Sequence, residues 1–200
     1  PHRRQPLRVG PGTGVPGHVE PLLLRSGTLE MKTEEYRRVS HVFGPVYDEN
    51  STILILGSFP SVKSREAAFY YQHPQNRFWK VLEALWEDSA GCTAEERKAF
   101  LLRHGIALWD VIESCEIIGS SDSAIRDVVP TDLRKVLQGA PIQRIYGNGN
   151  KAYQLYQKYH EAQTGILMTR LPSTSPANAA WSLERLIGAW SIIREREAHI

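Results

Sequence analysis

The chain has 200 residues, 42% of them apolar and 23% charged, which is typical of one folded domain and excludes a chain that is disordered throughout. No apolar run approaches the ~20 residues that a helix needs to cross a bilayer, so we expect a soluble, intracellular protein of the cytoplasm or nucleoid. The net charge of +2 is confined to residues 1–30, so any positive potential that attracts nucleic acid must be local.

The first 30 residues differ in composition from the rest. Proline and glycine, the residues least compatible with regular structure, make up a third of residues 1–30. We therefore expect a disordered leader over residues 1–30, either upstream sequence without function or a basic arm, and one folded domain over residues 31–200. The segment MKTEEYRRV, which begins at Met31, has helical character.

Four short apolar runs predict β-strands. The first is nearly all apolar, as expected of a strand covered on both faces. The runs are Thr52–Leu56, Ile106–Val111, Ile142–Tyr146 and Gly165–Leu171.

Helical patterns lie between and after these runs. Apolar residues recur at three- and four-residue spacings over 78–86, 153–159 and 183–193. Alternating strands and helices imply parallel strands joined by right-handed crossovers, so we predict a three-layer α/β/α fold with a central four-stranded parallel sheet. The helical periodicity also assigns an aromatic stripe to the core: Trp79, Trp86, Trp181 and Trp190.

Polar segments follow all four predicted strands. In open parallel sheets the ligand binds outside the carboxyl ends of the strands, so these segments predict a site at one edge of the sheet. They are GSFPS (57–61), the region of Asp110, GNGNK (147–151) and PSTSP (172–176).

Two of these segments resemble motifs of the uracil-DNA glycosylase superfamily. Residues 57–82 resemble its first motif region, in which a glycine turn precedes an aromatic residue and a His-Pro-x-Asn-Arg-Phe-Trp-Lys helix start, here HPQNRFWK (73–80). Gly57 and His73 have the same separation as in the mismatch-specific enzymes. The segment LPSTSPANA (171–179) resembles the second motif, and the similarity runs from about residue 50 to 190.

Details of the two motifs indicate one branch of this superfamily. Uracil-specific enzymes place Asp or Asn where this chain has Phe59, and several place His where it has Leu171. Together with SCEIIGSSDSAIRD (114–127), this is similar to the hypoxanthine-DNA glycosylases, also called DNA-deoxyinosine glycosylases. The resemblance implies a monomer that removes hypoxanthine from DNA by hydrolysis, with DNA carrying a flipped deaminated base as its partner.

The resemblance also implies roles for residues of the first motif. Tyr71 matches the aromatic residue that stacks on the flipped base, Phe59 closes the other face, and Gly57 and Ser58 belong to the same base site. For catalysis we single out Asn76, whose amide can donate to the purine O6 or N7 while its carbonyl accepts from N1–H. Asn is equally favoured as a helix N-cap, which leaves a structural alternative open.

His73 has a structural alternative of its own. Its place before Pro74 fits either a role in binding the base or a local hydrogen bond to a loop carbonyl.

Hydroxyl and basic side chains near both motifs are candidates for contacts with DNA phosphates. As solvated loop residues they need no function, and Ser175 before Pro176 equally predicts a helix cap. Because Ser175 stands where uracil enzymes carry a wedge leucine, the wedge residue stays unassigned. The candidates are Ser61, Lys63, Ser64, Arg65, Ser173, Thr174 and Ser175.

The water that attacks the sugar needs a residue to orient it. Asp110 is the best-placed carboxylate, because it lies near the end of a predicted strand, although Asp is also common there as a cap. Asn148, Asn150 and Lys151 are further candidates for contact with DNA, in a segment that equally predicts a tight turn.

No metal or cofactor is expected. Cys92 and Cys115 cannot supply the four thiolates of an all-cysteine zinc site or an iron–sulfur cluster, and we expect two free, buried thiols. Two other functions stay open: a uracil or mismatch glycosylase, and a non-catalytic module that binds nucleotide or damaged DNA.

Overall fold

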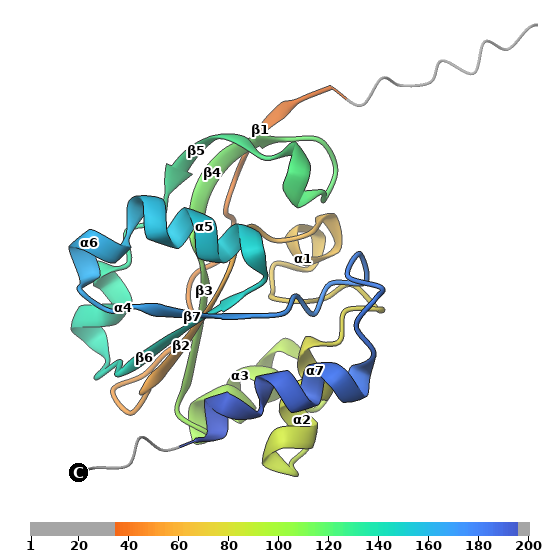
Figure 1. The fold of residues 1–200 in the computed structure, drawn as a ribbon, viewed down its shortest axis with the longest axis vertical. Helices are drawn as coiled ribbons and strands as arrows, with labels where there is room; N and C mark the ends of the chain where they lie inside the picture. The colour runs from red at the N-terminus through yellow and green to blue at the C-terminus, as the bar shows by residue number, and fades with distance from the viewer. Residues whose placement is uncertain (1–34, 196–200) are drawn as a thin grey trace, which may run out of the picture. The chain divides into compact units, whose positions relative to one another are not determined.

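The computed structural model describes residues 35–195, and all of them belong to the unit that begins at Glu34 (Figure 1). The predicted leader, residues 1–30, lies outside the described residues. None of the helices within 35–195 is long and apolar enough to cross a membrane.

A four-stranded parallel sheet forms the centre of this unit (Figure 1). Its order is β3 (Ile106–Asp110), β2 (Ile53–Gly57), β6 (Arg144–Asn148) and β7 (Met168–Leu171). The register pairs Gly57 with Asp110, and Asn148 with Leu171, at the carboxyl ends of the strands. The four predicted strands and their parallel arrangement are therefore confirmed, with bounds that differ by a few residues.

Strand β2 is buried on both faces, as its apolar sequence predicted. Ile53 and Ile55 belong to one core and Leu54 and Leu56 to the other, because side chains alternate along a strand. All four side chains are at most 5% exposed.

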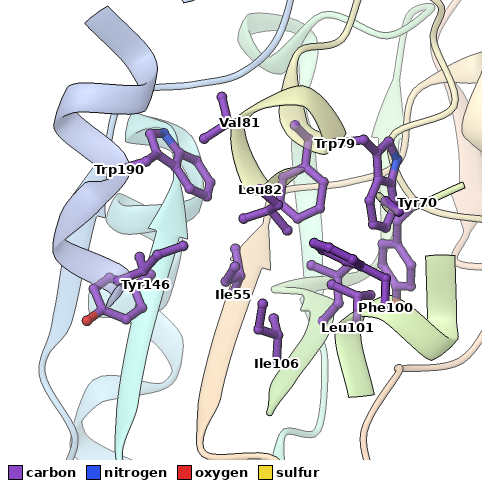
Figure 2. Packing of buried hydrophobic residues seen from close by; sticks show 14 of the residues in the cluster. Ile55, Tyr70, Trp79, Val81, Leu82, Phe100, Leu101, Ile106, Tyr146 and Trp190 are labelled. Carbon is purple, nitrogen blue, oxygen red and sulfur yellow. The ribbon is translucent and has the colours of Figure 1, made fainter. Parts of the chain in front are cut away.

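Helices α2 (Phe78–Trp86), α3 (Ala94–Arg103) and α7 (Leu183–Trp190) cover the face of Ile55. Figure 2 shows Leu82 of α2 beside Ile55, and Trp190 of α7 above Tyr146 of β6. Both predicted helices on this face are confirmed, and a 3₁₀ turn, η2 (Ser191–Arg194), follows the last one.

The other face is covered by helices α4 (Arg134–Gly139) and α5 (Asn150–Tyr159) and by a second sheet, and the short helix α6 (Glu161–Thr164) follows α5. This antiparallel sheet consists of β1 (Arg37–Ser40), β4 (Ile112–Ile117) and β5 (Arg126–Pro130), in the order β1-β4-β5. The sequence did not predict it.

Three further predictions need correction. The helical reading of MKTEEYRRV is wrong at Arg37–Val39, which belong to β1 and pair with β4, while residues 31–34 lie outside the described residues. Cys115 is buried but Cys92 is exposed, and both are free. Trp79 and Trp190 lie in the core, whereas Trp86 and Trp181 only pack partly against it.

Candidate active site

A cleft of about 900 Å³ opens at the carboxyl edge of the parallel sheet. Segments that follow all four parallel strands form its walls, as the sequence predicted. Its size is in the range of small-ligand sites. The predicted site residues that line it are Gly57, Ser58, Phe59, Ser61, Ser64, Tyr71, Asn76, Asp110, Asn148, Asn150, Ser173, Thr174 and Ser175.

Gly57 ends β2 at the floor of the cleft. A Cβ atom on this residue would lie 2.5 Å from Oδ1 of Asp110 and 2.9 Å from the hydroxyl oxygen of Tyr71. No side chain fits there, so glycine is required for the carboxylate and the phenol to approach the strand end.

The amide of Asn76 has a fixed orientation. Its Oδ1 accepts from the backbone N–H of Phe78 at 2.9 Å and from the hydroxyl of Thr174 at 2.9 Å. Because a backbone N–H can only donate, the contacted atom is the carbonyl oxygen, and the amide nitrogen is left to donate into the cleft.

This orientation changes one expectation about Asn76. The carbonyl already accepts two hydrogen bonds inside the protein, so the predicted acceptance from purine N1–H is wrong for this arrangement. The N-cap position of α2 is Arg77, so the helix-cap alternative holds only in that Asn76 accepts from the first N–H of the helix. This bond uses the carbonyl and leaves the N–H groups, so it is compatible with the catalytic role, which stays a prediction.

Thr174 holds two asparagines at once. Its hydroxyl donates to Asn76 and accepts from Nδ2 of Asn148 at 3.0 Å, while its backbone N–H donates to Oδ1 of Asn148 at 3.0 Å. Thr174 is completely buried. The predicted phosphate contact of Thr174 is therefore wrong, and this residue orients the amides.

Arg77 fixes the loop that contains Thr174. Its guanidinium donates to the carbonyls of Trp181, Ser175 and Asn178, the last two at 2.9 and 3.1 Å. Its backbone N–H donates to the carbonyl of Thr174. These bonds therefore join the segment before α2, which carries Asn76, to the loop after β7.

Tyr71 is the aromatic wall of the cleft. Its ring stacks on Phe78 with 4.0 Å between centroids and an interplanar angle of 23°. One face of the Tyr71 ring is thereby covered by Phe78. Burial raises the pKa of the Tyr71 hydroxyl, and the carboxylate of Asp110 raises it further, so the phenol stays neutral.

Tyr71 also has a left-handed backbone conformation, with φ of 52°. Non-glycine residues adopt this region at a cost, and such strain often marks a functional position.

Phe59 forms another part of the wall, with the guanidinium of Arg65 5.7 Å from its ring centroid. Arg65 also donates to the carbonyl of Gly119 at 3.1 Å, so its side chain braces this wall. Next to it, the Ser58 hydroxyl donates to Asp122 at 2.7 Å. Desolvation raises the pKa of Asp122, and the bond from Ser58 opposes that effect.

Asp110 has one oxygen at the cleft and one inside the protein. Oδ1 lies beside Gly57, and Oδ2 is 2.7 Å from Nε2 of His41. The sequence analysis missed His41, because nothing near it in the chain resembles a motif. Its partner, Asp110, lies on β3, 69 positions away.

Other predicted residues have different places. His73 does not line the cleft; its Nδ1 accepts from the backbone N–H of Gln75, so its assignment to base binding is corrected. Ser64 is buried and its hydroxyl accepts from the backbone N–H of Gln72, which argues against a phosphate contact. Lys63 is exposed, and its Nζ lies 3.8 Å from Oε2 of Glu66.

The predicted cap at Ser175 is also wrong. Helix α7 begins after Ser182, whose side chain accepts from the N–H of Arg185. Ser61 does cap a helix, α1 (Val62–Ala67), by accepting from Ser64.

The cleft is also lined by residues to which the sequence analysis gave no role in the site, among them Asp122, Arg170, Asn178 and Trp181. Arg170 is exposed beside Asn150, which makes it a candidate for phosphate contact. The sequence signal that could have identified Arg170 is its position directly before the second motif.

The chain matches the family model of the uracil DNA glycosylase superfamily over residues 45–194. It is 36% identical over 147 residues to a protein of Methanosarcina acetivorans named hypoxanthine DNA glycosylase, covering 72% of this chain and 90% of that one. A protein of the same name from Methanosarcina barkeri is 34% identical over 153 residues, covering 74% and 94%.

A similar solved structure has the same architecture. It is the solution NMR structure of a candidate uracil DNA glycosylase from Methanosarcina acetivorans, with 33% identity and a TM-score of 0.66. The match covers 76% of this chain and 93% of that one.

Proposed function

Because this chain belongs to the uracil DNA glycosylase superfamily, we propose that it removes hypoxanthine from DNA by hydrolysing the bond between the base and its sugar. The observation that carries the proposal is the amide of Asn76, whose carbonyl is held by Phe78 and Thr174 while its nitrogen is left for the cleft. From the resemblance to this superfamily we also propose that a monomer is active.

The chemistry needs a donor at the departing base. As the glycosidic bond breaks, negative charge develops on the purine and positive charge on the sugar, and a prepared hydrogen bond to the purine lowers the barrier. The N–H groups of Asn76 supply this bond to O6 or N7. The target must first leave the duplex, and it then stacks on the face of Tyr71 opposite Phe78.

The donor separates hypoxanthine from adenine when it binds O6, because N7 accepts a hydrogen bond in both bases. Hypoxanthine presents the acceptor O6, whereas adenine presents an amino group, so two donors would face each other in the cleft. Since the carbonyl of Asn76 is already used inside the protein, the side chain cannot turn over to accept from adenine without losing the bond from the Phe78 N–H.

Asp110 is the proposed residue that orients the attacking water. Its Oδ1 lies beside Gly57 at the cleft, where a carboxylate can accept a proton from water as the sugar becomes positively charged. Ser61, Ser173, Ser175 and Arg170 are the proposed contacts to phosphates at the rim.

A panel of oligonucleotides tests the proposal. Each duplex carries one inosine, uracil, xanthine or undamaged adenine, and abasic sites are detected by alkaline cleavage under single-turnover conditions. We expect cleavage at inosine and none at adenine. Faster release of uracil would favour a uracil glycosylase, and binding of inosine DNA without abasic sites would favour a non-catalytic module.

A further inference from the structure

The carboxylate of Asp110 is held by a buried histidine on the side away from the cleft. Oδ2 of Asp110 and Nε2 of His41 are 2.7 Å apart, and the two side chains are 4% and 5% exposed. The other oxygen, Oδ1, lies at the strand end beside Gly57, where Asp110 lines the cleft. One carboxylate therefore joins the cleft to an imidazole.

The imidazole of His41 is itself held firmly. Its ring contacts Phe43 with centroids 4.4 Å apart and lies at 6.0 and 6.1 Å from Tyr70 and Phe59. The backbone N–H of His41 donates to the carbonyl of Glu113 at 2.7 Å, directly after the pairing of β1 with β4. The small antiparallel sheet thus fixes where this ring lies.

A second cavity, of about 350 Å³, adjoins His41. Nδ1 of His41 has no hydrogen-bond partner among residues 35–195, and the same is true of the buried hydroxyl of Thr131 in that cavity. Asp110 lines the cleft and His41 lines the second cavity, so the pair spans the wall between them. The second cavity is lined by His41, Phe43, Trp109, Glu113, Thr131, Asp132 and Lys135.

The charge of Asp110 needs a partner at this depth. A buried carboxylate is costly unless it is hydrogen-bonded, and Nε2 of His41 is the side-chain hydrogen-bond partner that the described part of the chain offers it. The field of Asp110 also reaches Tyr70, whose pKa is raised by burial and then by this carboxylate. The charged groups on the far side of His41 are Glu113, Asp132 and Lys135.

We infer that His41 is a positioning residue for Asp110. It binds Oδ2, so that Oδ1 faces the cleft at the point where water must be oriented, and it supplies the hydrogen bond that a buried carboxylate requires. The inference rests on the proposed function, because Asp110 has this task only if the chain hydrolyses the glycosidic bond.

The pair is tested by His41→Ala with inosine duplex DNA under single-turnover conditions. We expect the rate of the chemical step to fall about 10²-fold, as for misplacement of a catalytic group, and the Kd for DNA to stay the same. The lost ring leaves a hole beside the second cavity, so added imidazole should restore part of the rate. His41→Gln, whose amide can still donate to Oδ2, should lose less than His41→Ala.

Asp110→Asn is the matched control. If His41 acts through Asp110, the double variant should be no slower than Asp110→Asn, and imidazole should not change its rate. A full further loss in the double variant, or no rescue of folded His41→Ala by imidazole, would overturn the inference.

Failure of the inference differs from failure of the proposed function. If the wild type releases hypoxanthine and Asp110→Asn is as fast, His41 has no such task but the glycosylase stands. If the wild type releases no base, the proposed function itself is wrong and the inference falls with it.

One further test uses the wild-type protein, so it does not require that a His41 variant folds. In protein labelled with ¹⁵N-histidine, the Nε2–H of His41 should give a downfield, slowly exchanging proton resonance that Asp110→Asn removes. Absence of that resonance from the wild type would contradict the pairing.

Discussion

The hydroxyl of Thr174 donates to Oδ1 of Asn76 at 2.9 Å, across 98 positions of the chain. This bond joins the two motifs that the sequence analysis found separately. It also decides what Asn76 can do, since a carbonyl with two internal partners leaves the amide nitrogen as the group that faces a base.

Replacing Thr174 by valine should impair catalysis more than binding. Thr174→Val keeps the shape but removes the donor to Asn76 and the acceptor for Asn148, so each amide loses one of the two bonds that fix its orientation. We expect a loss of about 10-fold to 10²-fold in the single-turnover rate on inosine DNA. Stability should fall by about 1–3 kcal/mol, because a buried polar group is left without a partner.

Thr174→Ser is the matched control, because it retains the hydroxyl. It should keep most of the rate. Equal losses in the two variants would show that the methyl group, rather than the hydrogen bonds, accounts for the effect.

Gly57→Ala should disable the site. The added methyl group would lie 2.5 Å from Oδ1 of Asp110 and 2.9 Å from the Tyr71 hydroxyl, so one or both must move. Since a displacement of about 1 Å can cost 10²-fold, we expect at least that loss in the single-turnover rate. Gly44→Ala is the control, because a methyl group there meets no atom within 4 Å. A Gly57→Ala enzyme as fast as the control would contradict the described geometry.

Asp88 should contribute to stability in a pH-dependent way. Hydrogen bonds from Arg103 and His104 lower the pKa of Asp88 to about 2. The unfolded chain therefore binds a proton at a higher pH than the folded one, so the contribution is complete above about pH 4 and is lost as the pH falls toward 2.

Thermal melts of wild type and Asp88→Asn test this. The melting temperature of the variant should be lower at pH 5, and the difference should shrink between pH 4 and pH 2. A difference that stays constant over this range would refute the role of the carboxylate.

The parallel sheet could be predicted because each strand carries its own signal. The run ending at Leu56 is apolar on both faces, and loops after parallel strands must meet at one edge. Strand β1 could not be predicted in the same way, since Arg37–Ser40 is largely exposed and becomes a strand only by pairing with β4.

Only part of the site could be predicted, because some of its residues lie in recognisable motifs and others matter only through contacts made in the fold. Asn76 and Tyr71 stand within a motif, whereas His41 gains its importance from a contact 69 positions away. Thr174 was noticed but given the wrong task, because residue type alone does not distinguish a hydroxyl that meets phosphate from one that is buried against an amide.

The central claim is that the amide nitrogen of Asn76 donates to the departing purine. Asn76→Asp tests it most directly, because a carboxylate still accepts from Phe78 and Thr174 and has nearly the same shape, but cannot donate. The measurement is the single-turnover rate of hypoxanthine release from inosine duplex DNA at saturating enzyme. We predict a fall of about 10²- to 10³-fold with the fold retained, the usual cost of one such donor. A folded Asn76→Asp enzyme that releases hypoxanthine at the wild-type rate would contradict the account.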